Sequence, residues 1–81
     1  MKGVTYGRLD AVLRSYGFQV RDVDEDTRVY ACPDSEALFA VPILSEAEPV
    51  STFHLLAAKA TLDAYGIADG DELTARLQKA G

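Results

Sequence analysis

The spacing of hydrophobic residues changes twice along this chain, near Gly17 and again after Pro49. Before the first change, apolar residues recur with the period of an amphipathic helix, at Leu9, Val12, Leu13 and Tyr16. Between the two changes, apolar and polar residues alternate as they do on half-buried strands. The helical period then returns. The pattern therefore predicts the element order α-β-β-β-α-α.

The first helix is expected over residues 5–16. Thr5 has the side chain of a good N-cap, and Gly17 suits the position just after the last helical residue. Gly7 weakens the first turn of this helix by about 1 kcal/mol relative to alanine. The flanking residues thus define both ends of a helix that is weakened near its start.

The three expected strands span residues 18–23, 28–32 and 37–41. A charged turn, Asp24-Glu25-Asp26, separates the first two strands, and Pro33-Asp34-Ser35-Glu36 forms the turn before the third. Pro42 has no N–H group, so it cannot donate a hydrogen bond to a neighbouring strand. These short connections predict a three-stranded antiparallel meander.

Two more helices are expected after residue 49. Ser51 or Thr52 can cap the first, which ends near Gly66. The apolar face of this helix is expected to comprise Val50, Phe53, Ala57, Ala60 or Thr61, and Tyr65, widened by Leu55, Leu56 and Leu62. Asp69 is the expected cap of the last short helix, whose apolar residues are Leu73 and Leu77.

Length and composition set the class of protein. Eighty-one residues make one domain, expected to be an α+β domain over 1–81 with helices packed on one face of the sheet. Thirteen acidic residues oppose eight basic ones, and the net charge of −5 lowers the expectation of a nucleic-acid partner. A single cysteine and the lack of a long apolar segment favour a cytoplasmic protein without a membrane span. No motif calls for a cofactor.

The central strands carry a resemblance to a known family. The segment Thr27-Arg28-Val29-Tyr30-Ala31-Cys32-Pro33-Asp34, followed by Val41-Pro42, resembles the central hairpin of the HicA-like toxin family. The segment Lys59-Ala60-Thr61-Leu62-Asp63-Ala64-Tyr65-Gly66-Ile67 resembles the family's C-terminal helix, which ends in glycine and an aliphatic residue. Asp71-Glu72-Leu73 is similar to the acidic-acidic-hydrophobic start of its last turn of helix. Members of the family cleave messenger RNA and have a fold like that of double-stranded-RNA-binding domains.

The resemblance has a direct consequence for activity. Where the family pattern has Gly-Ser-His, this chain has Glu25-Asp26-Thr27, so the family's catalytic histidine maps to Thr27. The resemblance thus implies a non-catalytic HicA-like domain that acts through protein–protein association, with a second copy of itself or with an antitoxin-like partner. The alternatives are a messenger-RNA-cleaving toxin and an RNA-binding module without cleavage.

The strand pattern indicates where a partner would bind. Residues 37–41 are apolar on both faces of the third strand, whereas helices of a chain this short can cover only one face. We expect Phe39 and Val41 to face the helices, and Leu38 to lie outside with Tyr30 or Cys32 across the ladder. The expected partner-binding residues are Tyr30, Cys32, Leu38 and Ala40.

Other candidate sites carry weaker signals. An RNA-binding protein would use the arginines of the first helix and hairpin as phosphate contacts: Arg8, Arg14, Arg21 and Arg28. Asp22, Asp24 and Asp26 resemble the start of a calcium loop, but its later Gly and Glu are missing, so no metal site is expected. His54 and Cys32 are expected to be structural rather than catalytic.

Overall fold

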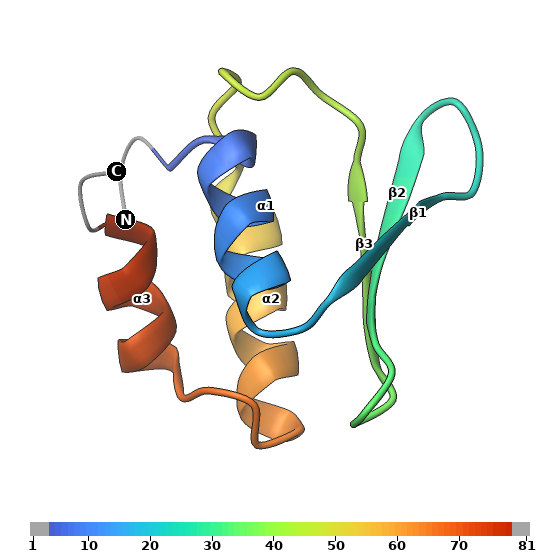
Figure 1. Cartoon of the computed structure of the whole chain (residues 1–81). Coiled ribbons are helices and arrows are strands. Elements are labelled where there is room, and N and C mark those ends of the chain that lie inside the picture. The colour runs from blue at the N-terminus through green and yellow to red at the C-terminus, as the bar shows by residue number, and fades with distance from the viewer. Residues whose placement is uncertain (1–3, 79–81) are drawn as a thin grey trace.

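The computed structural model describes residues 4–78 and has the predicted element order (Figure 1). The elements are α1 (Tyr6–Ser15), β1 (Gln19–Asp22), β2 (Thr27–Cys32), β3 (Ala37–Pro42), α2 (Thr52–Ala64) and α3 (Gly70–Gln78). The strands form one antiparallel sheet in the order β1-β2-β3, so the predicted α+β meander is confirmed.

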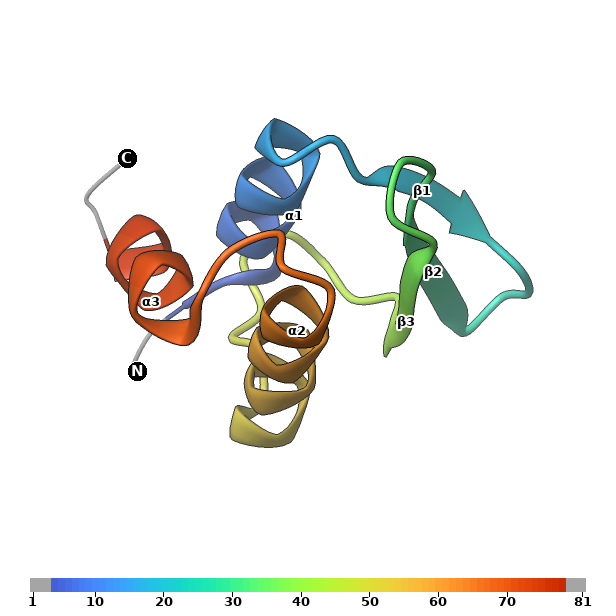
Figure 2. The same ribbon diagram turned by 90° about the horizontal axis from the view of Figure 1, so that it is seen from below.

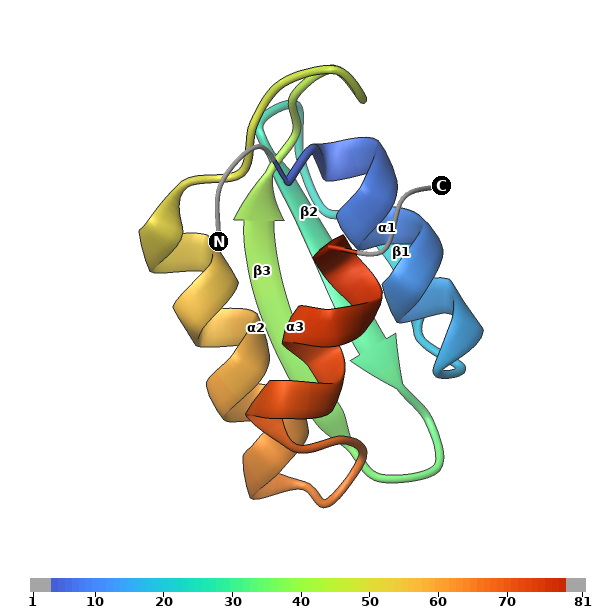
Figure 3. The same ribbon diagram turned by 90° about the vertical axis from the view of Figure 1, so that its left-hand side faces the viewer.

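All three helices lie on one side of the sheet (Figure 2). Helices α1 and α2 form the layer next to the sheet, with α2 beside β3, and α3 lies beyond them, away from the strands (Figures 2 and 3). The opposite face of the sheet is covered by no helix within residues 4–78. This arrangement leaves one whole sheet face available to solvent or to a partner.

The register of the strands determines which side chains share a face. Tyr30 pairs with Phe39, and Ala31 pairs with Leu38. Because directly paired residues point to the same side of an antiparallel sheet, Tyr30 and Phe39 face the helices, and Ala31 and Leu38 face away. The Tyr30 and Phe39 rings stack with their centroids 5.6 Å apart, and Phe39 packs against the core.

The start of α1 is held by a distant segment of the chain. Thr5 is the N-cap, as predicted, and its Oγ1 accepts a hydrogen bond from the Arg8 backbone N–H at 3.2 Å. The N–H groups of Tyr6 and Gly7 donate to the carbonyl oxygens of Glu48 and Glu46, at 2.9 and 3.0 Å. The loop before α2 therefore satisfies donors that the first helical turn cannot pair internally.

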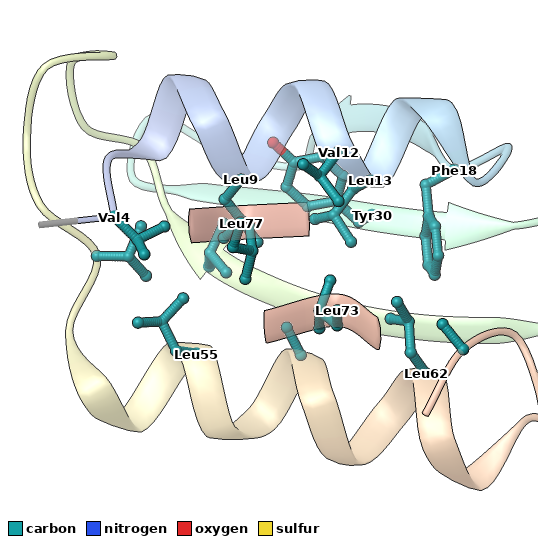
Figure 4. Packing of buried hydrophobic residues seen from close by; sticks show 14 of the residues in the cluster. Val4, Leu9, Val12, Leu13, Phe18, Tyr30, Leu55, Leu62, Leu73 and Leu77 are labelled. Atoms are coloured by element: carbon teal, nitrogen blue, oxygen red, sulfur yellow. The ribbon is translucent and has the colours of Figure 1, made fainter. Parts of the chain in front are cut away.

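The hydrophobic core lies between the sheet and the three helices (Figure 4). Leu9 and Leu13 of α1, Leu62 of α2 and Leu73 of α3 are its largest fully buried side chains. Figure 4 shows the labelled residues of α1 and α2 pointing toward one another. Burial of a leucine of this kind contributes about 1.5–3 kcal/mol relative to exposure.

The predicted apolar face of α2 is correct only in part, since Val50, Leu55 and Leu62 are buried as expected. Its buried residues are Leu55, Ala58 and Leu62, while Phe53 is 75% exposed and Tyr65 is 50% exposed. Because α2 is apolar on nearly every side, its sequence does not specify which side meets the core. Packing against β3 and α3 selects the side with the leucines at positions 55 and 62.

Candidate functional site

A polar cleft of about 220 Å³ lies between α1 and the sheet. The Tyr30 hydroxyl donates to Asp10 Oδ1 at 2.6 Å, and Arg14 Nε donates to Asp10 Oδ2 at 2.8 Å. On the sheet side, Arg28 Nε donates to Asp22 Oδ1 at 2.8 Å. Glu46, from the loop before α2, also lines the cleft. Most of the acidic and basic side chains in and beside the cleft are thus engaged in hydrogen bonds with one another or with Tyr30.

The pKa shifts of Tyr30, Asp22 and Arg28 all favour the ordinary ionisation states of these groups near neutral pH. Burial, followed by the hydrogen bond to Asp10, raises the pKa of the Tyr30 phenol, so it stays protonated as a donor. The hydrogen bond from Arg28 lowers the pKa of the Asp22 carboxyl and raises the pKa of Arg28 itself. A protonated phenol and carboxylates engaged by donors do not form a nucleophile with an adjacent base.

The structure does not gather the four predicted RNA-contacting arginines into one patch. Arg14 and Arg28 line the same cleft, but each is bound to a carboxylate. Arg8 donates through Nη1 to the Leu77 carbonyl oxygen at 3.3 Å, on the α3 side of α1. Arg21 pairs with Val29 and lies on the sheet face away from the helices. Their charges therefore do not form a continuous track for a phosphate backbone.

The helix-free face of the sheet is the second candidate site, and we call it the outer face. Paired positions place the following residues on it: Gln19, Arg21, Thr27, Val29, Ala31, Leu38, Ala40 and Pro42. Leu38 is 59% exposed, and a shallow depression beside it is lined by residues including Val29 and Ala31. Arg21 carries the one charge among these outer-face residues. The outer face is thus apolar in its middle and polar at the β1 edge.

Two of the four predicted partner-binding residues have the placement that was expected for them. Leu38 and Ala40 are exposed on the outer face, and Val41 faces the helices, as expected. Tyr30 and Cys32, however, are only 2% and 6% exposed and belong to the core. The error concerns register: Ala31, not Tyr30 or Cys32, lies opposite Leu38, because the four-residue turn 33–36 pairs Cys32 with Ala37.

Val29 and Ala31 lie on the outer face but were not among the predicted site residues. Because alternate residues of a strand point to opposite faces, the sequence already places Val29 and Ala31 on one face of β2 and Tyr30 and Cys32 on the other. The strand register determines which of these two pairs faces the helices. Asp10, which binds the Tyr30 hydroxyl, gave no signal beyond its place on the polar side of α1.

Thr27, the position to which the resemblance assigns the catalytic histidine, is the first residue of β2 and pairs with Pro42. It follows the turn of three acidic residues, in which Asp24 Oδ1 accepts a hydrogen bond from the Asp26 backbone N–H at 2.8 Å. Asp22 is engaged by Arg28 rather than by its acidic neighbours. Within residues 4–78, no group of three potential metal-ligating side chains could hold an ion.

His54 lies in the first turn of α2, where its Nδ1 is 2.7 Å from Ser51 Oγ. The same Ser51 oxygen accepts a hydrogen bond from the His54 backbone N–H at 3.3 Å, as the N-cap of the helix. A Ser–His pair needs a third group to orient the histidine for nucleophilic catalysis, and the described residues supply no carboxylate to its ring. Ser51 and His54 therefore form the N-terminal cap of α2.

No family model matches this chain, and no match is found among curated proteins or solved structures. In the part of the chain from residue 4 to residue 78, no helix is long and apolar enough to cross a membrane.

Proposed function

We propose that this protein is a non-catalytic domain that works by binding another protein through the outer face of its sheet. The observation that carries the proposal is Leu38 of strand β3, a large apolar side chain that is 59% exposed on a sheet face that no helix covers. Its neighbours on that face, Val29, Ala31 and Ala40, extend an apolar surface with little charge. Exposed apolar surfaces of this kind on small domains often bind partners.

The edge of the sheet offers a second element of the same surface. Strand β3 is at the edge, since β2 is its one neighbour in the sheet. An exposed edge strand can accept a strand from another chain, with backbone hydrogen bonds for affinity and outer-face side chains for specificity. A second copy or an antitoxin-like protein could supply that strand. The resemblance to HicA-like proteins supports this class of function but does not identify the partner.

The catalytic alternative has less support. Thr27 replaces the family's histidine, and a threonine hydroxyl does not accept a proton unaided at neutral pH. The acidic residues around it repel phosphate, and two of the four candidate arginines are bound to carboxylates. RNA cleavage would require chemistry that the described side chains do not assemble.

The test combines mass measurement with partner capture. Light scattering at tens of micromolar and affinity capture from a native lysate are carried out for the wild type and for Leu38→Glu. We expect the wild type to dimerise or to capture a specific protein, and Leu38→Glu to lose that association while keeping its unfolding temperature. A monomeric wild type that captures nothing contradicts the proposal. An association that Leu38→Glu leaves intact moves the binding surface away from the outer face.

A further inference from the structure

Helix α2 carries a second exposed apolar surface, distant in the fold from the outer face of the sheet. Five residues form it, and we call them the α2 stripe: Phe53, Leu56, Ala57, Ala60 and Ala64. Phe53 is 75% exposed and Leu56 is 56% exposed, and Ala60 and Ala64 are exposed as well. Within residues 4–78, no other helix or strand lies on the side of α2 that points away from α1 (Figure 2).

The α2 stripe is not an extension of the core. At 3.6 residues per turn, it is centred on the side of the helix opposite the buried Leu55, Ala58 and Leu62. An ordinary surface helix has charged residues on that side. Here Lys59 and Asp63 lie at the margin of the stripe rather than within it. The solvent-facing side of α2 is therefore as apolar as a helix–helix interface.

The shape of the α2 stripe suits another helix. Phe53 and Leu56 project at its N-terminal end, while Ala57, Ala60 and Ala64 leave a low, smooth surface toward its C-terminal end. Small residues spaced three and four apart allow a second helix to approach closely, and the large residues then fill the gap beside it. The stripe spans residues 53–64, so it is roughly 18 Å long and matches a partner helix of about 12–15 residues.

The charges around the α2 stripe indicate the sign of that partner. The acidic residues placed near the stripe are Asp63 on α2 itself, Glu48 shortly before the start of α2, and Asp69 and Asp71 on either side of Gly70. Lys59 lies against Gly70: its Cε is 3.2 Å from the position that a Cβ of Gly70 would occupy. The sequence neighbours of Gly70 are both acidic. The surroundings of the stripe thus attract positive charge.

We infer that the α2 stripe binds an amphipathic helix that has an apolar face flanked by lysine or arginine residues. The apolar side chains of that helix cover Phe53 and Leu56, and its basic flanks face the acidic ends of α2. A second copy of this chain is a poorer occupant. Antiparallel pairing of two α2 helices would bring Glu48 of each copy toward Asp63 and Asp69 of the other, so like charges would meet.

The experiment uses a synthetic 15-residue helical peptide of leucine and lysine, with a leucine–glutamate peptide of the same pattern as its counterpart. Each is titrated into isotope-labelled protein and followed by backbone amide chemical shifts. We expect the leucine–lysine peptide to shift residues 53–64 and the leucine–glutamate peptide to bind at least about tenfold more weakly. The double substitution Phe53→Gln and Leu56→Gln removes apolar surface without changing the charge, and we expect it to weaken binding by about tenfold or more.

Leu38→Gln is the matched control, because it removes an exposed leucine from the outer face instead. Peptide binding that is weakened by Leu38→Gln and unaffected by the α2 substitutions would overturn the inference and support the outer face alone. No shift in residues 53–64 at millimolar peptide, or equal binding of both peptides, also overturns it. If light scattering shows a dimer that the α2 substitutions abolish, the occupant is a second copy. Phe53→Gln alone serves if the double variant loses its fold.

Discussion

The Tyr30 hydroxyl donates a 2.6 Å hydrogen bond to Asp10 Oδ1 and thereby joins the middle of β2 to α1. The ring of Tyr30 is 2% exposed and stacks on Phe39, so only its oxygen reaches the polar cleft. Asp10 is bound at its other oxygen by Arg14, one helical turn further along α1. A single side chain of the core thus orients the polar edge of α1 relative to the sheet.

Replacing Tyr30 by phenylalanine keeps the packing of the ring and removes this hydrogen bond. We expect Tyr30→Phe to lower the free energy of unfolding by about 1–2 kcal/mol, because the acceptor is charged and the bond is partly shielded from water. Urea denaturation monitored by circular dichroism measures the change. Tyr65→Phe is the control, since Tyr65 is 50% exposed. Equal stability of wild type and Tyr30→Phe would show that the hydroxyl contributes no net free energy.

Burial of Tyr30, together with this hydrogen bond, makes the stability of the protein depend on pH in the alkaline range. The pKa of Tyr30 is raised in the folded protein above its ordinary value of 10.0, mainly by burial. The neutral phenol is therefore favoured by folding, and this contribution is complete below pH 10.0 and is lost as the pH rises toward the folded-state pKa.

We expect the free energy of unfolding to fall more steeply above pH 10.0 in the wild type than in Tyr30→Phe. Burial also raises the pKa of Tyr6 and, with the hydrogen bond to Glu72, that of Tyr16, so both proteins retain part of the slope. Ultraviolet absorbance of phenolate identifies the ionising groups. If the ionisation that occurs at the highest pH persists in Tyr30→Phe, the most strongly raised pKa belongs to another tyrosine.

Gly7 provides a test of the contact between α1 and the loop before α2. Helix propensity alone predicts that Gly7→Ala stabilises the protein by about 1 kcal/mol. A Cβ at this position, however, would lie 3.1 Å from Glu46 Cβ and 3.3 Å from the Glu46 carbonyl oxygen, which accepts the Gly7 N–H bond. We therefore expect Gly7→Ala to be no more stable than the wild type in thermal unfolding. A clear rise in melting temperature would mean that the loop before α2 moves to accommodate the added methyl group without a loss of stability.

Thr27 offers a test of the proposed loss of catalysis. We expect structured and unstructured RNA to remain intact when incubated with the purified protein and analysed on a gel. Thr27→Ala should give the same result, since Thr27 has no base beside it and stands next to an acidic turn. Cleavage that disappears in Thr27→Ala would show that this hydroxyl takes part in chemistry. Cleavage that persists in the variant would locate an active site elsewhere.

Local sequence features were sufficient to predict the elements and their ends. Thr5 and Asp69 accept hydrogen bonds from the first turns of α1 and α3, as their types predicted. Gly17 adopts a positive φ of 94° just after α1, a conformation that glycine reaches at little cost. These interactions join residues close in sequence, so the identity of a few neighbours is enough to specify them.

Which faces are buried could be predicted only where a segment has one apolar side. Helix α1 has such a side: Leu9, Val12 and Leu13 of its predicted stripe are buried, and Tyr16 packs against the core while partly buried. Strand β2 and helix α2 are apolar on two sides, so their patterns allow either orientation. Tyr30 and Cys32 point inward because the register pairs them with Phe39 and Ala37, and Phe53 points outward because Leu55 and Leu62 meet α3 and β3 instead. Those choices depend on contacts between residues far apart in the chain, which no local pattern contains.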